Sequence, residues 1–343
     1  MTFQVSLPSL YLSFFCFSAY AENIQIYTWE EYISDQVIAQ FEKETGHKVT
    51  QIYFDNEQLR DEVITTDRAL AYDLFIIDAY TLDSYQSHGA AKNLSKDLIY
   101  NKQHMDVDSL SSCGDWGVPY SWGTIGIGYR TSRIDIPITS WSQVFSLSEN
   151  GTKVVMPSDD IDTIATALLS LGYDPMSNDE DKLKQAYSLL SNNKNNILEF
   201  RTALGYALEM QENSEMETAV IYSGETYTLS QITKQEDWTY VVPDEGTILW
   251  YECFAAPADK PLSTATIEFL NFINRPEIAA KNAEDIWLAT TNKSALNYVS
   301  QEYLEDKELF PDPTILARSY HYTGLNDDSM KIRARIMSVL NNY

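Results

Sequence analysis

Histidine and cysteine are scarce in this chain, which has four His and three Cys among 343 residues. The cysteines have no metal-ligand spacing, and the chain contains no G-x-S-x-G, P-loop or H-E-x-x-H sequence. These absences argue against a zinc centre, a phosphate-binding loop and the common nucleophile motifs. We therefore expect no catalytic residue, no cofactor and no bound metal, and we predict that the chain is not an enzyme.

Charged residues are absent from residues 1–21, which are apolar from Leu10 to Phe17 and end in the sequence AYA. This pattern is typical of a secretory signal peptide cleaved after Ala21, although the usual basic residues near the start are missing. The apolar run is too short to span a bilayer, and no later stretch is long and apolar enough to do so. We predict a soluble, exported mature protein.

Only two cysteines follow the leader, Cys113 and Cys253. In an oxidising compartment they could form a disulfide. Buried free thiols are our default expectation, and the disulfide is the alternative.

Positive charge is also in short supply, since 24 Lys and Arg face 50 Asp and Glu, a formal net charge of −26. Nucleic acid is therefore an unfavourable partner, and a cationic ligand is a favourable one. The competing explanation, to which we give equal weight, is that the acidity only keeps an exported protein soluble.

The chain is long enough for about two domains with a large core, since 44% of its residues are hydrophobic. Its first block alternates strands with helices. Strands are expected at Ile24–Tyr27, His47–Phe54 and Leu74–Ile77, with helices at 34–46 and Asn56–Thr66 between them. This order predicts a parallel β-α-β-α-β unit.

Local signals mark the helix ends of this block. Ser34 is suited to the N-cap of the first helix, Gly46 to its C-terminal end, and Asn56 to the N-cap of the second helix. The loops at 28–32 and 78–80 carry aromatic rings and carboxylates directly after two strands. Ligands bind at the carboxyl ends of strands in open α/β sheets, so we expect both loops to face one crevice.

A second α/β block lies between two expected crossing strands, a glycine-rich one at 116–129 and a return strand at 247–256. Residues 158–162 form an expected turn, and capping alone could account for Asp160. The further expected strands are Lys153–Met156, Thr218–Tyr222 and Trp238–Val242, and the helices are Thr163–Leu171, Ala265–Ile273, Pro276–Asp285 and Asp328–Leu340.

Six segments follow one another in the order found in polyamine-binding proteins: YTWEEY, FEKETGHKV, YDLFIIDAY, VPYSWGTIGIGY, VIYSGETY and EGTILWYECFAAP. Over essentially all of residues 22–343 the chain resembles the periplasmic spermidine/putrescine-binding component of a bacterial ABC importer. The resemblance implies an α/β two-lobe periplasmic-binding-protein fold, each lobe a mixed, mostly parallel sheet flanked by helices, with the ligand in the interlobe cleft. Lobe 1 would comprise 22–127 and 252–295, and lobe 2 would comprise 128–251 and 296–343.

The same resemblance implies the protein's role and partners. The chain would capture spermidine or putrescine in the periplasm as a monomer and deliver it to an ABC permease and ATPase of the inner membrane.

The resemblance also implies the site. The family's aromatic box falls on Trp29, Tyr32, Tyr80, Tyr222, Trp250 and Trp287, where Tyr222 replaces a usual Trp and Trp287 a usual Tyr. Its amine-binding carboxylates fall on Glu31, Asp159, Asp162 and Glu252, where Asp162 replaces a usual Glu and Glu252 a usual Asp.

Two further positions follow from the comparison with this family. Asp78 stands where the family has Ser, and we expect it to contact a ligand ammonium rather than to cap a helix. A C-terminal polar contact would fall near Tyr320 or His321.

The chemistry of these residues suits a polyamine, because rings cover methylene groups and carboxylates hold ammonium groups. Three alternatives use the same residue types. A sugar-binding protein would use Trp and carboxylates, a ferric-ion binder would use paired Tyr ligands, and a glycoside hydrolase would use Glu31 and Asp78 as acid and base.

Overall fold

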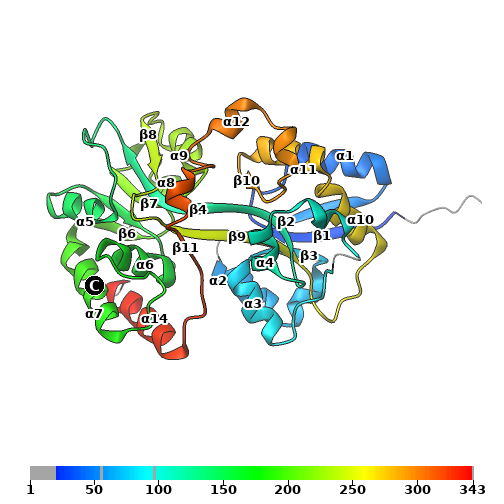
Figure 1. The fold of residues 1–343 in the computed structure, drawn as a ribbon, viewed down its shortest axis with the longest axis horizontal. Coiled ribbons are helices and arrows are strands. Elements are labelled where there is room, and N and C mark those ends of the chain that lie inside the picture. Colours follow the sequence, from blue (N-terminus) through cyan, green and yellow to red (C-terminus); the bar gives the residue numbers. More distant parts are fainter. Residues whose placement is uncertain (1–20, 55–56, 96–97, 342–343) are drawn as a thin grey trace, which may run out of the picture.

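The computed structural model describes residues 21–54, 57–95 and 98–341. The predicted leader, except for Ala21, and the predicted cap Asn56 lie outside these residues. Two halves lie side by side, and two long strands run from one half into the other (Figure 1).

The sheet strands follow the order β2-β1-β3-β9-β4-β7-β5-β6, with β10 and β8 on β4 and β11 on β9. Parallel pairs β1–β2 and β1–β3 form the first unit, as the sequence predicts. The strands are β1 Asn23–Thr28, β2 Lys48–Tyr53, β3 Leu74–Asp78, β4 Val118–Arg130, β5 Val154–Met156, β6 Ile197–Phe200, β7 Thr218–Tyr222, β8 Trp238–Val241, β9 Ile248–Ala255, β10 Ala289–Thr290 and β11 Tyr320–His321.

Helices flank the sheet in both halves, with α1 to α4, α10 and α11 in one half and α5 to α9 and α14 in the other (Figure 1). They are α1 Asp35–Thr45, α2 Glu57–Ile64, α3 Ala79–Ser87, α4 Val107–Cys113, α5 Trp141–Glu149, α6 Asp160–Ser170, α7 Glu180–Asn193, α8 Ala203–Met210, α9 Glu225–Thr233, α10 Thr264–Ile273, α11 Pro276–Ile286, α12 Gln301–Glu305, α13 Pro313–Leu316 and α14 Asp327–Asn341.

The β1–α1 unit forms where its local signals place it. The Ser34 side chain accepts from Val37 N, and Gly46 ends α1 with φ 79, a left-handed conformation that glycine adopts without strain. The apolar face of α1, including Phe41, packs under the sheet against α10. The predicted caps and core face of α1 are confirmed.

The predicted crossing strands are confirmed as β4 and β9. Residues 118–124 of β4 pair with β9, and residues 125–130 pair with β7 and β8, so one strand belongs to both halves. Gly123 faces Trp250 across this ladder, and a methyl group there would overlap the Trp250 ring and the Ser223 hydroxyl. Glycine at this position therefore makes room for an aromatic ring.

Cys113 and Cys253 form a disulfide that joins α4 to β9 across 140 residues of sequence. Our default expectation of free thiols was wrong. The reason is tertiary: the antiparallel β3–β9–β4 arrangement brings the end of α4 under β9, which the sequence spacing does not reveal.

The predicted turn at 158–162 is in fact the start of α6. Asp159 is its N-cap and accepts from Asp162 N at 2.8 Å, so Asp160 and Asp162 lie in the first helical turn. The capping function that aspartates serve at helix starts accounts for the difference. Helix α3, which the sequence analysis did not anticipate, begins directly after β3.

Separate apolar cores fill the two halves, one around Phe41 and Phe269 and one around Trp141 and Leu168. Tyr303, whose hydroxyl donates to Leu288 O at 2.6 Å, packs with α11 and β10. The predicted boundary between lobe 1 and lobe 2 at residues 295 and 296 stays a prediction.

Candidate functional site

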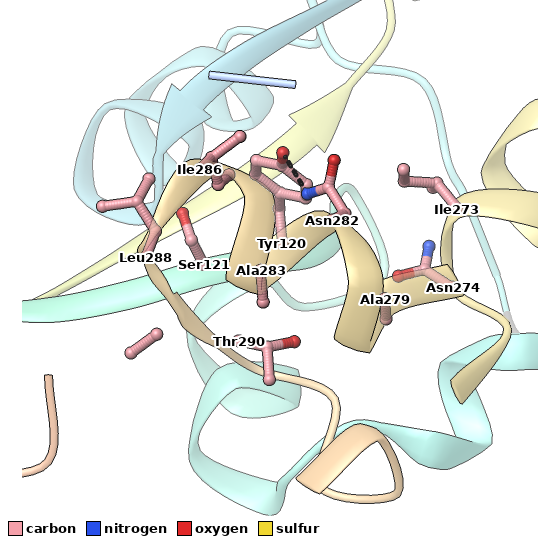
Figure 2. A pocket seen from close by; sticks show the side chains of 11 residues that line it. Tyr120, Ser121, Ile273, Asn274, Ala279, Asn282, Ala283, Ile286, Leu288 and Thr290 are labelled. Carbon is pink, nitrogen blue, oxygen red and sulfur yellow. Dashed lines mark hydrogen bonds between the residues drawn. The ribbon is translucent and has the colours of Figure 1, made fainter. Parts of the chain in front are cut away.

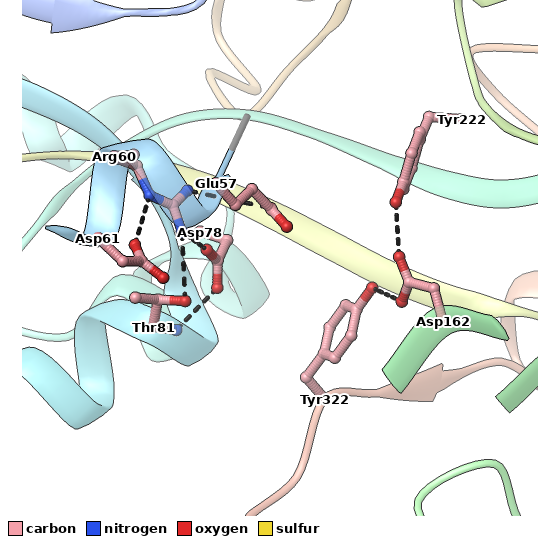
Figure 3. A network of polar contacts seen from close by, with 8 residues as sticks. All are labelled: Glu57, Arg60, Asp61, Asp78, Thr81, Asp162, Tyr222 and Tyr322. Carbon is pink, nitrogen blue, oxygen red and sulfur yellow. Dashed lines mark hydrogen bonds and ion pairs between the residues drawn. The ribbon is translucent and has the colours of Figure 1, made fainter. Parts of the chain in front are cut away.

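Carboxylates from both halves gather at the carboxyl end of β3, beside the middle of β9. Asp78 and Glu252 are register partners on these strands, and Ser121 of β4 pairs with Glu252 on its other side. Across from them lies Asp162 of α6 (Figure 3). This edge is the one at which open α/β sheets bind ligands.

Arg60 of α2 is the buried cation of this group, with 1% of its surface exposed. Its Nη2 donates to Asp78 Oδ2 at 2.9 Å, and its Nε donates to Asp61 Oδ1 at 2.9 Å. Burial alone would lower the pKa of Arg60, but Asp78, Glu57 and Asp61 outweigh it and raise the pKa. Arg60 is therefore firmly charged.

Asp78 has two protein partners in this structure. Its Oδ2 accepts from Arg60, and its Oδ1 caps α3 by accepting from Thr81 N at 2.7 Å (Figure 3). Asp78 therefore caps α3, a role that we expected it not to have. Contact between Asp78 and a ligand stays a prediction.

Glu252 is buried, with 7% of its surface exposed, and its Oε2 has no hydrogen-bond partner among the described residues. Burial, followed by the charge of Asp78, raises the pKa of Glu252 to about 8, while Arg60 and a hydrogen bond from Trp29 oppose the rise. A carboxylate in this state gains from a cation placed against its free oxygen.

Asp162 is held by two tyrosines. The Tyr222 hydroxyl donates to Oδ2 and the Tyr322 hydroxyl to Oδ1, both at 2.6 Å (Figure 3). Burial raises the pKa of Asp162, and these hydrogen bonds lower it in part. Burial, with the nearby Asp162, also raises the pKa of the Asp159 carboxyl.

Asp160, the third aspartate of this turn, is half-buried. Burial raises its pKa, and the positive charge of Arg333 in α14 opposes the rise. The structure thus gives Asp160 a cationic neighbour from the protein itself.

Tyr322 is a site residue that the sequence analysis missed. The expected contact was near Tyr320 or His321, and Tyr322 is the next residue. Tyr320 N pairs with Thr247 O, and the His321 ring stacks on Tyr251 at 5.9 Å. No local signal separates Tyr322 from these neighbours, because β11 takes its register from β9.

Glu57 is a second residue that the sequence analysis missed. It opens α2 just beyond β2, and Asp78 from one half and Asp159 and Asp162 from the other all raise its pKa after burial, the largest cause. The sequence held a signal here, because Glu57 follows the carboxyl end of a predicted strand, as residues 28–32 and 78–80 do.

Several predicted aromatic residues lie around these carboxylates. The Tyr80 and Tyr322 rings are 6.1 Å apart, which links α3 to the segment after β11. Trp250 is nearly buried, and its Nε1 has no partner among the described residues. Burial, followed by the charge of Glu252, raises the pKa of Tyr32.

Glu31 and Trp287 are set apart from the carboxylate group. Glu31 is exposed, with φ 56. The Trp287 indole donates to Asp306 Oδ2 at 2.7 Å, and its ring packs edge-on against Tyr303 at 5.7 Å. Their ligand contacts stay predictions.

A small cavity lies elsewhere, between α11 and β4 (Figure 2). Its volume is about 10 Å³, room for roughly one water molecule. Tyr120 and Asn282 line it and bond to each other at 2.9 Å. This space is too small for an organic ligand.

Within the described part of the chain, no group of three or more His, Cys, Asp or Glu is arranged to hold a metal ion. No helix in the same ranges is both long and apolar enough to cross a bilayer.

Comparison with known proteins gives consistent matches along the chain. A family model described as bacterial extracellular solute-binding protein matches residues 36–311. The norspermidine sensor of Vibrio cholerae serotype O1 is 31% identical and the alignment covers 97% of this chain and 92% of the sensor. The spermidine/putrescine-binding periplasmic protein of Escherichia coli K12 is 28% identical, with 84% and 83% covered.

A solved structure described as a putative spermidine/putrescine ABC transporter from Listeria monocytogenes superposes with a TM-score of 0.81 at 25% identity. The match covers 94% of this chain and 99% of that one. The two-lobe fold implied by the sequence is thus confirmed.

Proposed function

Because the chain belongs to the family of bacterial extracellular solute-binding proteins, we propose that it captures a linear polyamine and hands it to a membrane partner. The observation that carries this proposal is a group of four carboxylates, two buried (Asp162 and Glu252) and two partly buried (Glu57 and Asp159), whose pKa values are all raised. Burying so many anions is costly unless cations accompany them. Arg60 is engaged by Asp78 and Asp61, so a polycation from outside would supply the missing charge.

The aromatic residues supply the other half of the recognition. Tyr80, Tyr222, Trp250 and Tyr322 border the carboxylates, and each ring offers an apolar face to methylene groups or a π face to an ammonium group. An ammonium over such a ring gains roughly 0.5 to 2 kcal/mol. We include Trp29, Tyr32 and Asp78 in the site, with Glu31 and Trp287 at its margin.

The membrane partners follow from the relatives. Several are named as periplasmic binding proteins, and one solved neighbour is named as part of an ABC transporter. We propose a periplasmic, non-enzymatic carrier that works as a monomer with an ABC permease and ATPase. A hydrolase using Glu31 and Asp78 is disfavoured, because one is exposed and the other is bonded to Arg60 and Thr81.

A second candidate role is amine sensing, which uses the same bound state but a signalling partner. The observation that favours it is the 31% identity to a protein named as a norspermidine sensor. Uptake of labelled polyamine by cells with and without this chain separates the two roles, because a sensor changes gene expression or behaviour without carrying the amine.

Isothermal titration of the mature protein tests the proposal. Putrescine, cadaverine, spermidine, norspermidine and spermine are titrated separately, with maltose as an uncharged control. At least one amine should bind with micromolar or better affinity, about −8 kcal/mol or stronger. The absence of heat and of any thermal shift with all five amines would rule out polyamine capture, and a shift with maltose alone would favour a sugar ligand.

A further inference from the structure

Glu57 occupies a position that neither the predicted site nor the family resemblance includes. It lies in the first turn of α2, and its carboxylate points into the space between the Arg60 group and Asp162 (Figure 3). The negative charges of Asp78 in one half, and of Asp159 and Asp162 in the other, raise the pKa of Glu57. Glu57 thus stands between the carboxylates contributed by the two halves.

In the described part of the chain, the Glu57 carboxylate has an ion pair with Arg60 but accepts no hydrogen bond. The contact described for it is with Arg60, whose Nη1 is 4.0 Å from Oε1, too long for a hydrogen bond. Its side chain keeps 44% of its accessible surface although burial is the largest cause of its raised pKa. The Glu57 side chain is therefore partly open to solvent while its carboxylate lies among other acidic groups.

Two buried polar atoms nearby lack partners among the described residues and point to a missing ligand. Arg60, only 1% exposed, leaves Nη1 without a hydrogen bond on the side of Glu57. Glu252, 7% exposed, leaves Oε2 without one. Buried polar atoms in proteins are nearly always paired. The free Glu252 oxygen is an acceptor and suits an ammonium donor, whereas Arg60 Nη1 is itself a donor and needs an acceptor such as the Glu57 carboxylate beside it.

We propose that Glu57 binds the internal ammonium group of a triamine, while the carboxylates of the two halves hold its terminal ammonium groups. This inference rests on the proposed function and adds a selectivity to it. Three anionic positions, Glu252 with Asp78, then Glu57, then Asp159 with Asp162, match three positive charges along one chain. A diamine leaves the middle carboxylate without an ammonium partner, so the site favours triamines.

The test compares spermidine with diaminooctane, a diamine of equal length that has a methylene group where spermidine has its internal ammonium. The wild-type protein should bind spermidine at least about tenfold more tightly. Glu57→Gln should remove most of this preference by weakening spermidine and leaving diaminooctane within about threefold of wild type.

Glu62→Gln is the matched control, because it makes the same change on an exposed residue of the same helix. It should leave the spermidine preference unchanged, and circular dichroism of all three proteins verifies folding. Glu57→Asp, which keeps the charge, should retain part of the preference.

Each result of this test has a distinct meaning. Equal affinity of the wild-type protein for the two amines overturns the inference without any variant. Equal losses for both amines in Glu57→Gln, or no loss, overturn it as well. If the wild-type protein binds no linear amine, the proposed function itself fails.

Discussion

Replacing Glu252 with Gln should change how the stability of the unliganded protein depends on pH. Glutamine has nearly the same shape but cannot ionise, so the substitution isolates the charge. The site of the change is buried, and the register partner of Glu252 is another carboxylate, Asp78. The folded protein therefore prefers Glu252 protonated, as its pKa of about 8 indicates.

The magnitude follows from proton linkage. The ordinary pKa is 4.5 and the folded value is about 8. Between these values the folded state holds a proton that the unfolded chain releases, so stability falls by about 1.4 kcal/mol for each pH unit gained. From about pH 5 to about pH 7 the wild-type protein should lose roughly 3 kcal/mol through this group. Glu252→Gln has no such loss.

Urea unfolding of both proteins without ligand, at a series of pH values, measures this difference. The stability of the variant relative to wild type should rise by roughly 3 kcal/mol between about pH 5 and about pH 7. Glu62→Gln, whose side chain is exposed, should show no such trend. A difference that stays constant over this interval would refute the reasoning.

The same group should make polyamine binding depend on pH in the opposite sense. An ammonium beside Glu252 favours the ionised carboxylate, so affinity should fall as pH decreases from about 8 to about 6. Binding near pH 7 should release protons, which titration in buffers of different ionisation enthalpy detects. Glu252→Gln should bind at least about tenfold more weakly and lose most of the proton release.

Three other changes have expected outcomes. Asp78→Ser removes an ion-pair partner of Arg60 together with a carboxylate cap, so chemical unfolding should show a loss of about 2 to 4 kcal/mol; an unchanged stability would mean that these contacts contribute nothing. Tyr322→Phe removes a hydrogen bond to Asp162 and should weaken spermidine binding about threefold to tenfold with little effect on folding, whereas unaltered affinity would place Tyr322 outside the site. Breaking the disulfide with Cys113→Ala should cost about 2 to 5 kcal/mol of stability, and a variant as stable as wild type would contradict this.

The parts of the fold with strong local signals could be predicted from the sequence. Ser34 and Gly46 mark both ends of α1, and β7 spans Thr218–Tyr222 as expected. The crossing strand β4 could be predicted too, because glycines in an apolar run are uncommon in ordinary strands. The predicted start of α6 was wrong because aspartate is common both in turns and at helix N-termini. The aspartates before Thr163 therefore fitted either structure.

The site could be predicted only in part, because its remaining features are tertiary. The disulfide depends on α4 reaching β9, and Tyr322 reaches Asp162 only through the pairing of β11 with β9. The ion pair of Asp78 depends on Arg60, which lies 18 residues away in sequence. Glu57 follows the carboxyl end of a predicted strand and could have been identified as a site residue on that ground, but it was not predicted.

The passage of β4 and β9 through both halves has a mechanical consequence. Because β4 and β9 are hydrogen-bonded to each other, sliding one strand along the other would break ladder bonds, whereas twisting the pair or bending it out of the sheet plane would keep them. Trp250 and Glu252 lie on β9, so a molecule that contacts their side chains acts directly on the pair of strands that connects the two halves.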